Sequence, residues 1–207
     1  ERTMPRSIVD LSAITSIYRP GPLSASVDKA YIKAVANPDD VDYLNDTVRE
    51  VTEETYGFLI FQEQIAKLAY ELGDGITMDE ANLLRKILTK KGTGKGHEVK
   101  EAIYDKFISG CVSKDIDKRS AKELWQTFEY FSGYGFNKSH AVSYSIISYQ
   151  CAWLCTYYKA EWVASFLDKE PESRKEKAIN LAKQHGYKIK PLNINYSEST
   201  WKIEGED

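Results

Sequence analysis

Three helix-start signals, each ahead of an apolar stripe, constrain the fold of this chain more than any other feature. Ser7-x-x-Asp10, Thr77-x-x-Glu80 and Ser120-x-x-Glu123 have the spacing of capping boxes, in which side-chain oxygens satisfy the first free N–H groups of a helix. Behind the second signal, apolar residues recur at helical spacing at Ala81, Leu84, Ile87 and Leu88. This pattern predicts a mainly α fold made of several amphipathic helices.

Three segments interrupt the helical pattern. Arg19-Pro20-Gly21-Pro22 should end the first helix and form a loop with Arg19 at its corner. The apolar run 56–64 predicts a short β-like segment, and 187–195 alternates like a strand or an extended C-terminal arm. We expect two parts, a helical domain over 1–168 and a helix plus extended segment over 169–207.

Aromatic residues gather in one stretch of the chain. Thirteen of the 25 aromatic residues fall between Trp125 and Phe166. Their helical spacing, as in Tyr149, Trp153 and Tyr157, is more typical of a core than of a platform for stacked bases. We therefore expect helices over about 120–132 and 140–168 to form the centre of the core.

The composition narrows the class of protein. The chain has 207 residues, long enough for one large or two small domains. It has no apolar run near the roughly 20 residues that span a bilayer and no signal-peptide pattern, so we expect no membrane partner and a cytoplasmic location. Three cysteines without CxxC spacing fit free thiols in a reducing compartment. The first residue is Glu1 rather than Met, which suggests a piece of a longer polypeptide.

The net charge of −3 hides a strong asymmetry along the chain. Residues 39–54 contain seven acids and one base, whereas residues 85–100 contain six bases and one acid. Local charge steers phosphate groups, so the basic stretch is a candidate surface for nucleic acid or a triphosphate. The alternative is a solvated helix end whose bases offset the helix dipole.

The segment Tyr134–Ala141 combines a glycine between two aromatics with four polar side chains at the entrance of a helix. The polar residues are Asn137, Lys138, Ser139 and His140. Free N–H groups and the positive end of the helix dipole, with Lys138 and His140 beside them, suit the binding of an anion.

Catalytic groups are few. Asp39, Asp40 and Asp42 form an acidic block, but a loop dense in acids is usually only solvated, and the three histidines lack zinc spacing. Ser139 and His140 are adjacent, yet neighbouring positions on a helix point about 100° apart, which argues against a nucleophile–base pair. We expect no catalytic residue and no metal ligand on this chain.

Four motifs in register resemble the fingers region of the alpha subunit of bacterial DNA polymerase III, the C family of replicative DNA polymerases. They are Tyr18–Leu23, Ile60–Gln64, Leu84–Lys86 with Lys90-Lys91, and Tyr134–Ala141, and Ser148–Gln150 also agrees. The resemblance covers roughly residues 1–195, including a similar exit segment at 189–195.

The resemblance implies a fingers-type domain that contacts the incoming dNTP and primer–template DNA during nucleotidyl transfer. By motif position, these contacts fall on Arg19, Arg85, Lys86, Lys90, Lys91, Asn137, Lys138, Ser139 and His140, with Gln62 and Gln64 shaping the site. The family binds Mg²⁺ through palm aspartates that this chain does not match, so the isolated chain should bind rather than polymerise. Implied partners are the palm and thumb domains and, beyond them, the sliding clamp and other replisome proteins.

Some positions depart from the family pattern. Thr89 stands where the family usually has Gly, Cys155 where it has Lys, and Lys159 where it has Pro. These differences affect the expected basic surface more than the resemblance itself, and would suit a phage or otherwise unusual member of the family. An alternative hypothesis is a non-catalytic, fingers-like module that binds DNA or a replisome protein.

Overall fold

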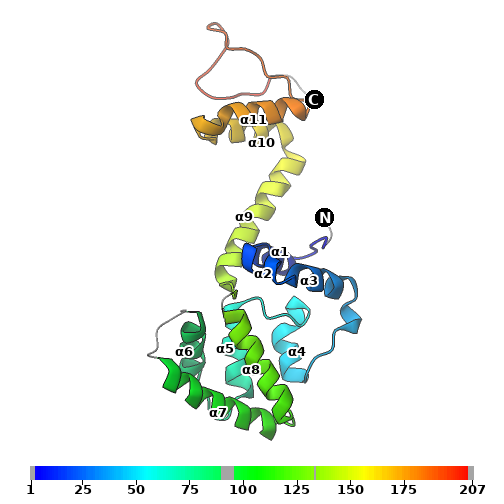
Figure 1. Ribbon diagram of the computed structural model, residues 1–207. Helices are drawn as coiled ribbons and strands as arrows, with labels where there is room; N and C mark the ends of the chain where they lie inside the picture. The colour runs from blue at the N-terminus through cyan, green and yellow to red at the C-terminus, as the bar shows by residue number, and fades with distance from the viewer. Residues whose placement is uncertain (1–2, 90–95, 133, 205–207) are drawn as a thin grey trace. The chain divides into compact units, whose positions relative to one another are not determined.

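The computed structural model describes residues 3–89, 96–132 and 134–204, and the fold over these residues is helical (Figure 1). The helices are α1 Ile8–Ile17, α2 Pro20–Ser24, α3 Val27–Ala36, α4 Asp46–Thr52, α5 Gln62–Leu72, α6 Met78–Thr89, α7 His97–Ser113, α8 Lys118–Ser132, α9 Lys138–Tyr157, α10 Lys159–Lys169 and α11 Glu172–Gln184. Two 3₁₀ turns, η1 Pro38–Asp40 and η2 Glu53–Thr55, flank α4. The expected mainly α fold is confirmed.

The chain divides into two compact units, residues 1–146 and residues 147–207. The first unit contains α1 to α8 and the beginning of α9, and the second contains the rest of α9 with α10, α11 and the C-terminal segment. The expected functional division at 168 and 169 stays a prediction. None of the helices in the described ranges is long and apolar enough to cross a membrane.

Two of the three capping boxes are confirmed. The Ser7 hydroxyl accepts from Asp10 N at 3.0 Å, and Asp10 Oδ2 accepts from Ser7 N at 3.1 Å. Thr77 and Glu80 make the same reciprocal bonds ahead of α6. The third box is wrong: Asp117, not Ser120, caps α8, because its Oδ1 accepts from Arg119 N and Ser120 N.

The segment after α1 is more helical than expected. The loop predicted over 19–22 is only Tyr18 and Arg19, since Pro20 begins the short helix α2. Proline suits the first position of a helix, where its missing N–H would have had no intrahelical partner. Arg19 therefore lies at the N-cap of α2 in extended backbone geometry.

A single β-bridge replaces the expected β-like run over 56–64. Phe61 pairs with Phe136 in parallel orientation, and no strand occurs in the parts of the chain that the structure describes. The apolar side chains that suggested a strand are buried all the same: Leu59, Ile60 and Phe61 are each less than 5% exposed. A segment that is buried on several sides has a continuous apolar run whether it is a strand or an irregular stretch of chain. Periodicity alone therefore could not distinguish the two conformations.

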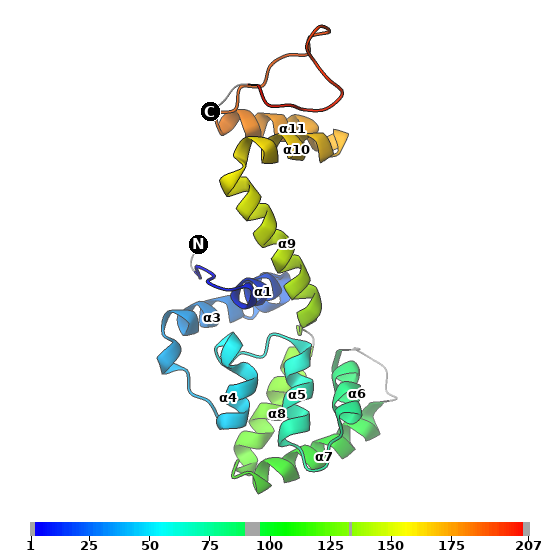
Figure 2. The same ribbon diagram turned by 180° about the vertical axis from the view of Figure 1, so that it is seen from behind.

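The larger of two apolar clusters in the first unit is built from the helices α4, α5, α6, α7 and α8. In Figures 1 and 2, α5 lies among α4, α6 and α8, and α7 runs across the end of this group. Phe107 of α7 packs against Trp125 and Phe128 of α8 at ring distances of 5.4 and 5.2 Å. The second cluster joins α1, α3, the 58–61 segment and the beginning of α9 through Ala13, Ile17, Tyr31, Ile60, Phe61 and Ala141.

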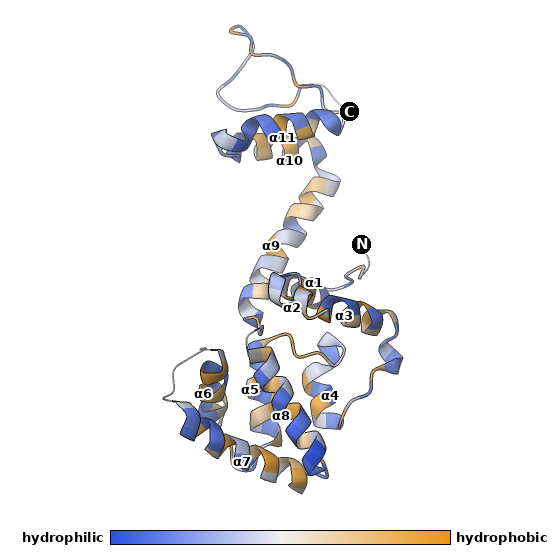
Figure 3. Ribbon diagram, viewed as in Figure 1, coloured by the Kyte–Doolittle hydropathy of each residue, from blue (hydrophilic) through white to orange (hydrophobic). Residues whose placement is uncertain are grey.

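The core predicted over 120–132 and 140–168 is half correct. Trp125 and Phe128 of α8 are buried, but the stretch 140–168 is two helices that separate at Tyr158, and most of its large side chains are exposed. Figure 3 shows apolar residues along α9. The aromatic side chains of Tyr149, Trp153 and Tyr157 on this helix are 56, 42 and 68% exposed. No Gly or Pro marks the break at Tyr158, and clustering of aromatics in a sequence does not report which face is covered.

The C-terminal segment after α11 contains neither helix nor strand up to residue 204. Within the second unit, Trp201 N donates to Asp168 Oδ1 of α10 at 2.8 Å. Leu192 and Ile194 are more than 90% exposed. The absence of regular structure and the exposed side chains agree with the expected extended arm, while the Trp201 bond brings the end of the segment back to α10.

Candidate nucleotide-binding site

The Phe61–Phe136 bridge brings the Tyr134–Ala141 motif beside the start of α5. Phe136 N donates to Ile60 O at 3.0 Å, and Gln62 N donates to Phe136 O at 2.9 Å. Two segments that are more than 70 residues apart are therefore joined by backbone bonds on both sides of one residue. This junction is the framework on which the expected site residues lie.

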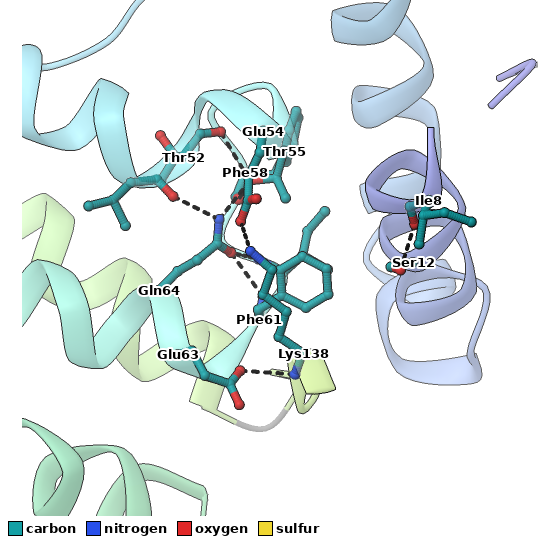
Figure 4. A network of polar contacts seen from close by, with 12 residues as sticks. Ile8, Ser12, Thr52, Glu54, Thr55, Phe58, Phe61, Glu63, Gln64 and Lys138 are labelled. Atoms are coloured by element: carbon teal, nitrogen blue, oxygen red, sulfur yellow. Dashed lines mark hydrogen bonds and ion pairs between the residues drawn. The ribbon is translucent and has the colours of Figure 1, made fainter. Parts of the chain in front are cut away.

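Gln64 supports the junction from inside the protein. Its side chain is 4% exposed, and its Oε1 accepts from the backbone N–H groups of Ile60 and Phe61, both at 2.9 Å. Its Nε2 donates to Val51 O at 3.2 Å and to Thr55 Oγ1 at 2.8 Å. Figure 4 shows this amide at the centre of the network, where it fixes the turn into α5.

Gln62 connects the junction to α6. Its Nε2 donates to Gly135 O at 3.0 Å, and its Oε1 accepts from Arg85 Nη1 at 3.1 Å. The two halves of one amide thus hold the glycine of the motif and the arginine of α6. Over the residues that the structure describes, Gln62 is the hydrogen-bond partner found for the Arg85 side chain.

Arg19 approaches the same motif from the other side. Its Nη2 donates to Tyr134 O, its Nε donates to Ser16 O at 2.7 Å, and its guanidinium carbon lies 4.6 Å from the centre of the Phe136 ring. Burial lowers the pKa of this guanidinium from its usual value, although an arginine stays charged near neutral pH. Arg19 is therefore built into the framework as well as carrying charge to it.

The beginning of α9 already holds a carboxylate. Glu63 Oε2 accepts from Lys138 N at 3.0 Å (Figure 4). Glu63 Oε1 accepts from Asn137 Nδ2 at 2.8 Å. Asn137 Oδ1 accepts from His140 N at 2.9 Å and from Ser139 Oγ at 2.7 Å. Asn137 thus caps the helix, and the N–H groups of Lys138 and His140, which were among those that suggested an anion site, have internal partners.

Lys138 also has an internal partner. Its ammonium group forms an ion pair with Glu54 of η2 and lies 5.5 Å from the centre of the Phe61 ring. Sequence reasoning missed both Glu54 and Glu63. Glu63 lies inside the Ile60–Gln64 motif and Glu54 inside the acidic stretch, but only the fold shows that both acids face the motif at 134–141.

The remaining expected residues are more peripheral. Lys86 is exposed on α6, and the exposed His140 ring lies 5.5 Å from Phe136 and 4.6 Å from Tyr144. Lys90 and Lys91 fall outside the described residues. The structure therefore brings together Arg19, Gln62, Arg85, Asn137 and Lys138, while Gln64 lies behind them, Ser139 and His140 border them, and Lys86 adds charge on the surface of α6.

The described residues do not offer a metal centre. Over 3–89, 96–132 and 134–204, no three His, Cys, Asp or Glu side chains come together as metal ligands. Mg²⁺ favours carboxylate oxygens, and the carboxylates of Glu54 and Glu63 are bonded to Lys138 and Asn137. No chemical step through a metal is assigned to these residues.

Comparison with known proteins gives one consistent result. Residues 1–114 match the family described as the bacterial DNA polymerase III alpha subunit finger domain. The whole chain is 37% identical to the DNA polymerase III subunit alpha of Aquifex aeolicus and 39% identical to that of Rickettsia conorii. That of Halalkalibacterium halodurans is 32% identical over 98% of the chain.

The chain spans only 17–18% of the length of these relatives. The match nevertheless runs through every segment of the junction, from Arg19 to His140, and continues to the C-terminal segment. With its helical fold and its four motifs in register, this chain belongs to the family of bacterial DNA polymerase III alpha subunit finger domains.

Proposed function

We propose that this chain forms part of a replicative DNA-directed DNA polymerase and binds the triphosphate of the incoming dNTP together with primer–template DNA. One observation carries the proposal: Arg19, Arg85 and Lys138, from three distant segments, are held on one framework of hydrogen bonds. Three cations around a fixed junction suit a polyanion, because each charge-assisted hydrogen bond to phosphate contributes more than a neutral one.

Arg85 is the first candidate for phosphate contact. Gln62 holds one of its nitrogens and thereby fixes the direction of a planar fork that matches phosphate geometry. The guanidinium group of Arg19 has a different role, since it already donates to two backbone carbonyl oxygens and so holds the framework in place. Lys86, Lys90 and Lys91 extend the positive charge along the same stretch of sequence and would contact DNA or the phosphates of the dNTP.

The contribution to catalysis is electrostatic. Negative charge builds up on the leaving pyrophosphate during nucleotidyl transfer, and cations in fixed positions stabilise that transition state more than the ground state. Mg²⁺ would be held by the palm domain of the complete polymerase. We therefore propose that the palm and thumb domains are partners of this chain, that the sliding clamp and other replisome proteins act with the whole subunit, and that it works in the bacterial cytoplasm.

The test uses a complete alpha subunit that carries this segment, with primer–template DNA and a single nucleotide turnover. Replacing Arg85 with Ala should raise the apparent Kd for dNTP about tenfold or more, since a hydrogen bond to a charged group contributes about 1.5–3 kcal/mol. Lys67→Ala, which removes an exposed cation from α5, is the matched control and should leave the Kd unchanged. An unaltered Kd in Arg85→Ala would contradict triphosphate contact by this residue.

The alternative, a non-catalytic module, predicts a different result. Such a module would bind DNA or a protein without affecting nucleotide affinity. DNA binding through lysine and arginine weakens steeply with salt, whereas binding to an apolar protein surface does not. Mixing the chain with a palm-containing fragment and Mg²⁺, followed by primer extension, separates the two functions.

A further inference from the structure

The Lys138 side chain is directed at an acid of its own chain. It extends from the start of α9 to Glu54 in η2, 84 residues earlier in the sequence. The two side chains are 34% and 33% exposed. An ion pair exposed to this extent remains within reach of a dissolved anion.

The backbone of Lys138 is anchored independently of this ion pair. Glu63 Oε2 accepts from Lys138 N at 3.0 Å, Asn137 Oδ1 accepts from His140 N at 2.9 Å, and Ala141 is fully buried. The helix start therefore has no need to move when the ammonium group changes partner. Rotation about the bonds of the four-carbon side chain is enough.

A carboxylate and a phosphate are the same class of partner for an ammonium group. From these contacts we infer that Glu54 competes with the incoming triphosphate for Lys138 and so sets the affinity for dNTP. This inference rests on the proposed function, because it assigns the Lys138 ammonium to the nucleotide in the occupied state. When only a fraction of the protein has Lys138 free, the apparent Kd is larger than the intrinsic Kd by the inverse of that fraction.

Glu63 has the complementary role in this arrangement. It bonds the backbone of Lys138 and the side chain of Asn137, not the ammonium group. Glu63 therefore holds the motif in place with and without bound nucleotide, while Glu54 releases the Lys138 ammonium group when the nucleotide binds. Two acids that face the same motif thus act in opposite directions on nucleotide affinity.

The test compares Glu54→Gln with the unaltered protein in a complete alpha subunit that carries this segment. Single-turnover incorporation of dATP opposite a template thymine gives the apparent Kd and the maximal rate separately. Glu54→Gln should lower the apparent Kd about twofold to fivefold, the range of a partly exposed ion pair, and leave the maximal rate unchanged. Glu54→Asp, which keeps the charge on a shorter side chain, should fall between the two.

Glu50→Gln is the matched control. Glu50 is an exposed acid on the neighbouring helix α4, and its replacement changes the net charge by the same amount. A decrease in Kd of the same size in Glu50→Gln would overturn the inference, because it would show a general effect of charge. A Kd in Glu54→Gln that stays the same or rises would also overturn it, and loss of structure can only raise the Kd.

The Lys138→Ala background separates this inference from the proposed function. If Lys138→Ala alone leaves the Kd unchanged, Lys138 does not contact the triphosphate, and the proposed competition by Glu54 is wrong as well. If Lys138→Ala raises the Kd and Glu54→Gln still lowers it in that background, the proposed function stands and the competition is wrong. We expect Glu54→Gln to have no effect once Lys138 is absent.

Discussion

Gln62 and Gly135, 73 residues apart, are joined by a 3.0 Å hydrogen bond from the Gln62 side-chain amide to the Gly135 carbonyl oxygen. The same amide accepts from Arg85, so one side chain sets the position of the motif and of a candidate phosphate ligand together. A Cβ at Gly135 would lie 3.0 Å from Gln62 Cγ, which leaves little space between the two segments. The geometry of the candidate site therefore depends on Gln62, a residue that need not contact the ligand.

Replacing Gln62 with Ala should weaken nucleotide binding without abolishing folding. Both side-chain bonds are lost, and Arg85 loses the partner that fixes its direction. The expected rise in apparent Kd is about threefold to thirtyfold, from two hydrogen bonds of about 0.5–1.5 kcal/mol each that act only partly on binding. Single-turnover incorporation measures it, and in an Arg85→Ala background Gln62→Ala should have a smaller effect. Equal effects in both backgrounds would show that Gln62 does not act through Arg85.

Replacing the buried Gln64 with Leu should lower the free energy of unfolding by about 2–4 kcal/mol, because the backbone N–H groups of Ile60 and Phe61 lose their acceptor inside the protein. Urea unfolding followed by circular dichroism measures the change. Gln126→Ala on the exposed face of α8 is the control and should change stability by less than about 0.5 kcal/mol. Comparable losses in both variants would mean that the network around Gln64 contributes little.

Gly21→Ala should destabilise the protein even though Gly21 lies in α2. A Cβ at this position would overlap the Tyr134 ring. In an open helix the same substitution would stabilise by about 0.5–1 kcal/mol, so a loss of stability reports the contact with the motif. Thermal unfolding of Gly21→Ala with and without Tyr134→Ala tests this, since removal of the ring should relieve the overlap. A loss that persists without the ring would point to the backbone instead.

Glu80 should contribute to stability in a pH-dependent way. The hydrogen bond from Lys106, together with those from Thr77, lowers the pKa of its carboxyl to about 2. Because the pKa is lower in the folded state, this contribution is present at pH values above the ordinary pKa near 4.5 and is lost as the pH falls toward 2. Glu80→Gln should therefore reduce the unfolding temperature at pH 7 and flatten its dependence between pH 4.5 and 2.

Asp79→Asn is the control for Glu80, since it removes the same charge from the same first turn of α6. Its unfolding temperature should keep the pH dependence of the unaltered protein over this range. An identical change in both variants would attribute the effect to the helix dipole rather than to the capping bonds.

Local patterns predicted a large part of this structure. Capping boxes at Ser7 and Thr77 and the stripes behind them located α1 and α6 because those signals depend on contacts within one turn. The apolar run at 56–64 predicted a β-like segment, but only the single bridge at Phe61 forms, and its partner Phe136 is remote in sequence. The prediction that the aromatic residues of α9 lie in the core was also wrong, because the spacing of residues on a helix does not show which face other elements cover.

The sequence by itself determined that the chain is mainly helical and which residues carry charge and motif, because helix caps and periodicity are properties of neighbouring residues. Only the tertiary structure decided that Gln62 links Arg85 to Gly135 and that Glu54 and Glu63 face the motif at 134–141. Pairings across 23 to 84 residues depend on how helices pack, and packing is set by the fit of many side chains together rather than by any local signal. The sequence suggests that the motif at 134–141 offers free positive charge, but in the folded chain it already contacts the carboxylates of Glu54 and Glu63.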